Sequence, residues 1–149
     1  MYKLDELDKS ILKELEKDAR RSLRQISRKL GISITTLSKR ISKMEKANVI
    51  KGYVAIVDPE TIGFDIVAII EIVVSKGKLL DVEKEIAKMK NVFAVYDVTG
   101  STDAFILARF RKRSELSNFV KSLLSMPYIE RTNTHLVLNT IKENKTIDL

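Results

Sequence analysis

The residues with the clearest chemical capacity lie on one face of a helix expected over residues 34–47. This face carries short hydroxyls and cations and meets no acid before Glu45; its members are Thr35, Thr36, Ser38, Lys39, Ser42 and Lys43, with Arg40 at the edge. Such side chains can approach phosphates and base edges closely. A face that is merely solvated usually mixes Glu with Lys. The pattern therefore predicts a DNA-binding surface, with a solvated helix surface as the alternative.

Groups that catalyse reactions or hold metals are scarce. The chain of 149 residues has no cysteine and one histidine, His135. The lack of cysteine excludes a disulfide scaffold, a thiolate nucleophile and a cysteine-ligated metal. A lone histidine in a predicted strand is more typical of a surface or interface than of a metal site. We expect no catalytic residue, no metal and no cofactor.

The net charge of +7 is confined to the first third of the chain. Residues 1–52 hold 14 Lys/Arg and 7 Asp/Glu, whereas residues 53–149 hold 13 of each. A basic block beside a neutral body is typical of a protein that binds a polyanion, here double-stranded DNA. The chain has no apolar run of the roughly 18 residues that a membrane span needs. Its start is polar, so we expect no membrane contact and a cytoplasmic location.

Local signals place three helices in residues 1–52. The expected N-caps are Asp5, Ser22 (in a capping box with Gln25) and Ser33. The expected ends are near Asp18, Gly31 and Ala47. About three residues join the second and third helices, which is the helix-turn-helix arrangement. The residues expected to contact DNA are Arg24, Arg28, Lys39, Arg40 and Lys43 at phosphates, Thr35, Thr36, Ser38 and Lys39 at bases, and the capping residue Ser33 beside them.

The rest of the chain alternates strands and helices. A strand is expected over 49–57 and a turn and linker over 58–63, where we place the domain boundary. Further elements are expected in the order strand 66–75, helix 79–89, strand 92–99, strand 104–111, helix 114–124 with Ser114 as its cap, and strand 131–141. This order is that of a ferredoxin-like βαββαβ sandwich. The fold class is α+β, with a helix-turn-helix domain at 1–52, a strand and linker at 53–63 and a ferredoxin-like domain at 64–149.

The predicted sheet is apolar on both faces. On the strand at 66–75, one face carries Ile66, Ala68, Ile70, Ile72 and Val74, and the other carries Val67, Ile69 and Val73. The strand at 92–99 has Val92, Ala94 and Val98 on one face and Phe93 and Val95 on the other, and the strand at 104–111 has Ala104, Ile106 and Ala108 against Phe105 and Leu107. Two helices can cover only one of them, and an open apolar face is a sticky patch. The simplest cover is a second copy of the sheet, which predicts a homodimer. The alternative is that terminal segments fold over the face.

Four stretches of the chain resemble the Lrp/AsnC family of transcription regulators, also called feast/famine regulatory proteins. They are Leu4–Leu12, Arg24–Ser33, Arg40–Tyr53 and Val95–Asp103. One departure is Ser27, where helix-turn-helix sequences often have alanine, but serine is small enough to fit. The resemblance implies a winged-helix-like reader joined to an αβ sandwich that binds a small molecule. It also implies dimers that assemble into octamers or other higher oligomers.

The resemblance further implies an amino-acid effector bound at the contacts between dimers. By position, its site residues are Thr99, Gly100, Ser101, Thr102, Asp103, Thr132 and Thr134. Backbone N–H groups of a glycine loop can receive a carboxylate, and Asp103 can pair with an ammonium group. An ordinary hairpin turn is the alternative reading of Gly100–Asp103.

Two other functions compete with a sequence-specific regulator. An architectural protein would wrap DNA without strong sequence choice. Sirohaem decarboxylases resemble the same two-domain family but need basic and histidine side chains in the cleft of the second domain. That domain has balanced charge and only His135 here, so we expect no enzyme.

Overall fold

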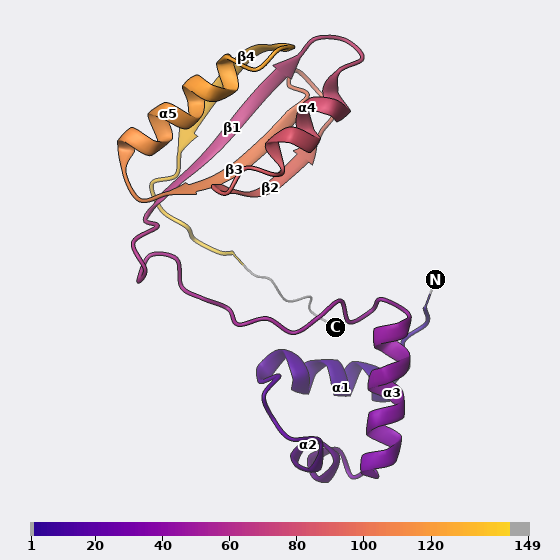
Figure 1. The fold of residues 1–149 in the computed structure, drawn as a ribbon. Helices are drawn as coiled ribbons and strands as arrows, with labels where there is room; N and C mark the ends of the chain where they lie inside the picture. The colour runs from indigo at the N-terminus through magenta and orange to yellow at the C-terminus, as the bar shows by residue number, and fades with distance from the viewer. Residues whose placement is uncertain (1, 144–149) are drawn as a thin grey trace. The chain divides into compact units, whose positions relative to one another are not determined.

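The computed structural model describes residues 2–143, which fall into two compact units (Figure 1). The first unit comprises the described residues up to Ile56 together with Lys142 and Glu143, and the second spans Val57–Ile141. The division between Ile56 and Val57 falls within 53–63, the segment predicted as strand and linker, and just before the turn at 58–63 where the boundary was expected. The predicted end of the second domain, beyond residue 143, lies outside the described residues.

Three helices make up the first unit: α1 (Glu6–Lys17), α2 (Leu23–Leu30) and α3 (Ile34–Lys46). Their N-caps are Asp5, Ser22 and Ser33, as predicted, and each cap side chain accepts a backbone N–H from the first turn. The apolar stripes of the helices meet in one small core, whose buried members are Ile11, Ile26, Leu37, Ile41 and Met44. Local caps and helical periodicity therefore account for this unit.

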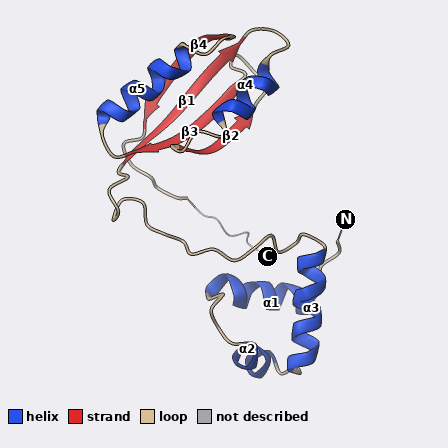
Figure 2. Ribbon diagram, viewed as in Figure 1, coloured by secondary structure: helices blue, strands red, loops and turns tan. Residues whose placement is uncertain are grey.

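The second unit is a four-stranded antiparallel sheet with the order β2-β3-β1-β4. Its elements follow the chain as β1 (Ile66–Val74), α4 (Leu79–Ile86), β2 (Val92–Asp97), β3 (Ala104–Phe110), α5 (Arg113–Leu124) and β4 (Ile129–Leu136). Both helices cover the same face of the sheet (Figure 2). The ferredoxin-like βαββαβ prediction is confirmed.

The two central strands alternate as predicted. On β1, Ala68, Ile70 and Ile72 are buried under the helices, and on β3 the buried set is Ala104, Ile106 and Ala108. The residues between them are half-buried. The sheet face opposite the helices, which we call the open face, is built from Val67, Ile69, Glu71, Val73, Phe105, Leu107 and Arg109 on these two strands.

The predicted alternation of β2 is wrong after its first residue. The register to β3 shifts between Val92, which pairs with Ala108, and Ala94, which pairs with Leu107. The irregularity changes the face of every later residue. As a result Val95 packs against the core beside Val92, although the sequence pattern assigned the two to opposite faces.

The strand predicted over 49–57 does not form in the described chain. Residues 51–58 pair with no strand, and their apolar side chains are largely exposed, with Val54 at 85% and Ile56 at 71%. The composition favours a strand, but a strand also needs a neighbour that supplies hydrogen bonds. Among the described residues, no strand lies beside this segment.

Several element boundaries differ from the predictions: α4 ends at Ile86 rather than at 89, and β2 ends at Asp97 rather than at 99. The last strand is β4 at Ile129–Leu136 rather than 131–141, because β1 supplies its partners from Val74 back to Ala68 and a final bond joins Val137 N–H to the Val67 carbonyl. Helix α5 begins at Arg113 with Lys112 as its N-cap, so Ser114 lies inside the first turn and does not cap it. Among the described residues, no helix is long and apolar enough to cross a membrane.

Candidate nucleic-acid interface and effector loop

The turn between α2 and α3 is built by Gly31. Its φ of 67° is left-handed, a conformation that costs glycine least. The Ile32 N–H then donates to the Ser27 carbonyl at 3.0 Å and closes the turn. Ser27 itself is 5% exposed, and its hydroxyl donates to the Arg24 carbonyl at 3.1 Å. Serine therefore fits at this position with its hydroxyl satisfied.

The structure exposes eight of the nine residues predicted to contact DNA. They are Arg24, Arg28, Ser33, Thr35, Thr36, Ser38, Lys39 and Lys43. Within the described chain, Arg24, Arg28 and Lys39 form no ion pair. These cations can therefore neutralise phosphates without first breaking an internal contact.

Two of the predicted contact residues are already bonded to each other. The Ser33 side chain accepts the Thr36 N–H at 3.0 Å, and the two hydroxyl oxygens lie 2.8 Å apart. This pair fixes the first turn of α3 and orients the Thr36 hydroxyl. Lys43, one turn beyond Lys39, sits with its ammonium 5.4 Å from the centre of the Tyr2 ring.

Arg40 differs from the other eight because its guanidinium is committed inside the protein. Its side chain is 32% exposed and forms ion pairs with Asp5 and, at 2.9 Å, with Asp8. The hydrogen bond from Arg40 is the main cause that lowers the pKa of Asp5. Arg40 was predicted at the edge of the polar face as a phosphate contact, and no local signal in the chain points to these partners, which lie 35 and 32 residues earlier.

A second network joins α2 to α1. The Glu14 side chain is 6% exposed and contacts Lys29 Nζ at 2.7 Å and Arg21 Nη1 at 2.8 Å. The hydrogen bond from Lys29 is the largest cause of the lowered pKa of Glu14. Of the basic block in this unit, Arg21 and Lys29 are therefore occupied in holding the helices together.

The loop predicted to bind an effector is pinned to the end of β1. Thr102 is 8% exposed and its hydroxyl donates to the Ile72 carbonyl at 2.8 Å. The Asp103 carboxylate accepts the Val74 N–H at 2.8 Å, and the Asp103 N–H donates to the Ile72 carbonyl at 3.0 Å. These two residues therefore hold the loop in place, while Thr99, Gly100 and Ser101 are exposed.

The two threonines of β4 reach the same region from the other side of β1. Thr132 is the ladder partner of Ile72 and Thr134 is the partner of Ile70. Thr132 is half-buried and Thr134 is exposed. The structure thus brings the loop and Thr132 to the two sides of one residue of β1, with Thr134 two residues further along the strand.

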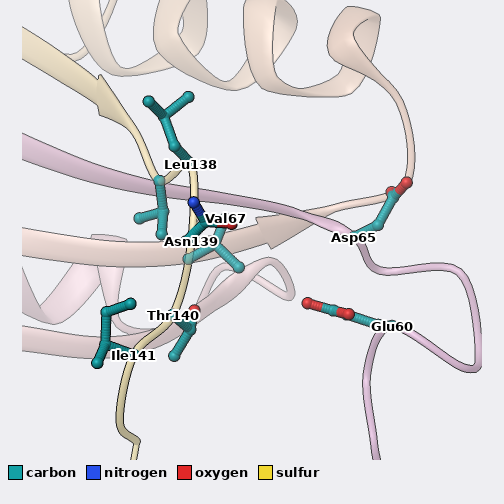
Figure 3. Close-up of a pocket in the computed structure, with 8 residues that line it drawn as sticks. Glu60, Asp65, Val67, Leu138, Asn139, Thr140 and Ile141 are labelled. Atoms are coloured by element: carbon teal, nitrogen blue, oxygen red, sulfur yellow. The ribbon is translucent and has the colours of Figure 1, made fainter.

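A pocket of about 370 Å³ lies near the opposite end of β1 from this loop (Figure 3). It is lined by Glu60, Asp65, Val67 and residues 137–141. No residue predicted to bind the effector lines it. His135 lies on the open face instead, with its Nε2 atom 2.8 Å from Glu71 Oε1. Within residues 2–143 there is no group of histidines and acids that could hold a metal ion.

A helix-turn-helix with a basic, acid-poor third helix, followed by a ferredoxin-like sandwich, defines a two-domain DNA-binding regulator. Two family models match the chain: a winged helix-turn-helix DNA-binding model over residues 4–51 and the Lrp/AsnC ligand binding domain over residues 67–147. The chain belongs to the Lrp/AsnC family of DNA-binding transcription regulators.

This chain is similar to transcriptional regulators along almost the whole length of both proteins. An uncharacterised HTH-type transcriptional regulator of Pyrococcus abyssi is 43% identical over 141 residues, which are 95% of this chain and 96% of that protein. The HTH-type transcriptional regulator FL11 of Pyrococcus horikoshii is 38% identical over 146 residues, with 98% of this chain and 97% of FL11 covered. The chain is accordingly a regulator and not an enzyme.

Solved structures agree with this assignment. AsnC of E. coli has a TM-score of 0.92 at 26% identity, with 97% of this chain and 99% of AsnC covered. A transcriptional regulator of Neisseria meningitidis in complex with L-Met has a TM-score of 0.90 at 26% identity, with 98% and 97% covered.

Proposed function

We propose that this protein is a sequence-specific transcription regulator that reads DNA with α3 and responds to an amino acid or a related small molecule. The observation that carries the DNA-reading role is the outer face of α3, where exposed hydroxyls and cations occur together without an acid before Glu45. Arg24 and Arg28 extend the positive surface onto α2. Phosphate contacts supply affinity and register, and the hydroxyls with Lys39 supply base readout.

Fluorescence anisotropy tests this proposal on DNA from upstream of the protein's own gene and on a scrambled duplex of equal length. We expect tighter binding to the upstream fragment. If a dimer neutralises about 6–10 phosphates, affinity falls about 10³–10⁵-fold between 50 and 200 mM salt. The absence of binding to either duplex at low salt contradicts the proposal.

The regulator acts as a homodimer in this proposal. The open face carries Ile69, Leu107 and other half-buried apolar side chains that a second sheet can cover. The segment at 51–58 supports the same conclusion, because its apolar Val54 and Ile56 are exposed and it pairs with no strand among the described residues. Two reading helices related by a two-fold axis read half-sites about one DNA turn apart.

Assembly of dimers into an octamer is the second level of the proposal. The exposed apolar residues Leu80 on α4 and Leu124 on α5, 61% and 53% exposed, provide surface for such contacts. Sedimentation analysis distinguishes the two levels, since a dimer and an octamer of a 17.0 kDa chain differ fourfold in mass. A species that stays dimeric at all concentrations contradicts this level only.

The effector site of the proposal is the region formed by Thr99–Ser101 and Thr132. The complex of the Neisseria meningitidis regulator with L-Met supports an amino acid as the ligand class. Since Thr102 and Asp103 bond to β1, they hold the loop, and the exposed backbone of Thr99–Ser101 is left for the ligand. A thermal-shift screen of the amino acids tests this, and no stabilisation by any of them counts against the site.

An architectural role is the alternative for the same DNA-binding surface. It predicts equal affinity for the upstream and scrambled duplexes and a footprint much longer than two half-sites. The regulator predicts a sequence preference and a bounded footprint. Both the regulatory and the architectural role are consistent with a cytoplasmic location, and the proposal includes this location.

A further inference from the structure

Arg40 connects the middle of the reading helix to the start of α1. Its Nη1 atom donates to Asp8 Oδ1 at 2.9 Å and also contacts the Asp5 carboxylate. Asp5 is the N-cap of α1 and Asp8 lies in its first turn. One guanidinium therefore joins two helices that are separate in the sequence.

The two acids are themselves held in place by α1. The Asp5 side chain accepts the Asp8 N–H at 2.8 Å, and the Asp8 side chain lies 3.4 Å from the Asp5 N–H as the second half of the capping box. The Tyr2 hydroxyl adds a long contact of 3.4 Å to Asp8. A capping box gives the carboxylates a fixed direction, so Arg40 is anchored to a rigid point.

The ion pairs of Arg40 with Asp5 and Asp8 lie where they can affect DNA binding. Arg40 lies next to Lys39 and one turn from Thr36 and Lys43, so the acids stand beside the surface that meets phosphates. Two unpaired carboxylates there would repel DNA. Arg40 offsets their charge, and the Nη1 atom that contacts both carboxylates lies one covalent bond further along the side chain than a lysine ammonium does.

We propose that Arg40 is a positioning residue for DNA reading: it sets the rotation of α3 against the start of α1 through Asp5 and Asp8, and does not itself bind a phosphate. This inference rests on the proposed function, in which α3 reads DNA. It assigns Arg40 a different role from Arg28, Lys39 and Lys43, and it gives Asp5 and Asp8 a role in site discrimination although neither touches DNA.

The decisive variant is the double substitution Asp5→Asn, Asp8→Asn. Asparagine caps helices about as well as aspartate, so α1 keeps its start while both ion pairs are lost. The probes are a duplex that the wild type selects from a random-sequence library and a shuffled duplex of the same composition. We expect the ratio of the two affinities to fall about tenfold, in the range set by one base contact. Binding to the shuffled duplex does not weaken, because the variant gains positive charge.

The opposite result overturns the inference. If Arg40 is a phosphate contact restrained by the two acids, their removal frees it. Both duplexes then bind more tightly, their ratio is unchanged, and the salt dependence becomes steeper. Adding Arg40→Gln to the double variant gives a second test. If Arg40 is a phosphate contact, the magnitude of the slope of log K against log salt decreases by about 0.9 per copy. If Arg40 is a positioning residue, the affinity ratio and the slope stay as they are in the double variant.

Two further variants distinguish a positioning role of Arg40 from a general loosening of the three-helix unit. Arg40→Lys keeps the charge, both acids and the cap, so it tests the contact even if the double variant fails to fold; we expect the ratio to fall here too. Glu14→Gln is the matched control. Glu14 is a buried acid on α1, as Asp8 is, but it pairs with Lys17, Arg21 and Lys29, all of which lie outside α3. A loss of discrimination in Glu14→Gln equal to that in Arg40→Lys overturns the inference. If the wild type selects no sequence at all, it is the proposed function that fails.

Discussion

The proposed function divides single side chains on α3 into those that contact DNA phosphates and those that contact bases. Lys43→Ala removes an exposed cation. We expect it to weaken binding to all duplexes alike and to reduce the salt slope by about 0.9 for each copy that contacts the DNA. Anisotropy titrations at several salt concentrations measure the slope, and Lys121→Ala on α5 is the control that leaves it unchanged.

Thr36→Ala tests the other half of this division. The Thr36 hydroxyl is held by Ser33 at 2.8 Å in the first turn of α3, where recognition helices meet base edges. We expect affinity for the selected duplex to fall about 5-fold or more with little change on a shuffled duplex. If Thr36→Ala weakens both duplexes equally while Lys43→Ala loses discrimination, the two roles have been assigned in reverse.

A partly buried carboxyl in the second unit, that of Glu83, gives a prediction about pH. Glu83 Oε1 is buried without a hydrogen-bond partner among the described residues, and burial, together with the charge of Asp97, raises the pKa of Glu83. A carboxyl whose pKa is raised by folding destabilises the fold once the pH exceeds its unfolded value of about 4.3. We expect the Tm of the wild type to fall by a few degrees relative to Glu83→Gln as the pH rises from about 4 to 7.

Calorimetry of both proteins across that pH range measures this difference. Glu85→Gln on the same helix is the control, because Glu85 pairs with Lys88 on the exposed surface. Equal pH dependence in the wild type and Glu83→Gln would mean that Glu83 is solvated in solution.

Among the elements, the sharp turn between α2 and α3 depends on one backbone conformation. Gly31 has a φ of 67°, and a Cβ at this position meets no atom within 4 Å. Gly31→Ala is therefore strained without a clash and is expected to cost about 1 kcal/mol of unfolding free energy. Gly31→Asn costs less, because asparagine visits this conformation more readily. Urea unfolding followed by circular dichroism compares the two, and an equal cost contradicts the backbone explanation.

Assembly of the whole molecule depends on what covers the open face of the sheet. Leu107→Lys places a charge at the centre of this face, and we expect it to convert the dimer to a monomer and to lower DNA affinity, since one copy reads one half-site. Analytical ultracentrifugation measures the mass. Asn118→Lys on exposed α5 is the control with the same added charge. A dimer that survives Leu107→Lys shows that the pairing surface lies elsewhere.

Features with local causes could be predicted from the amino-acid sequence alone. Helix caps and helix ends depend on residues a few positions apart, so Asp5, Ser22, Ser33 and Gly31 could be assigned from their near neighbours in the chain. The exposed cations and hydroxyls of α3 followed from the same periodicity. The order of strands and helices in the second unit was also predictable, because apolar alternation marks each strand.

Features that need a distant partner emerged only in the folded chain. Arg40 meets acids 32 and 35 residues away, and Thr102 and Asp103 form hydrogen bonds with backbone groups of β1 that lie 30 and 29 residues earlier. The register shift in β2 moved Val95 to the core, and the segment at 51–58 stayed unpaired. The residue type determines which hydrogen bonds and ion pairs a side chain can form. Tertiary packing determines which partners come within bonding distance and which backbone segments lie beside another strand.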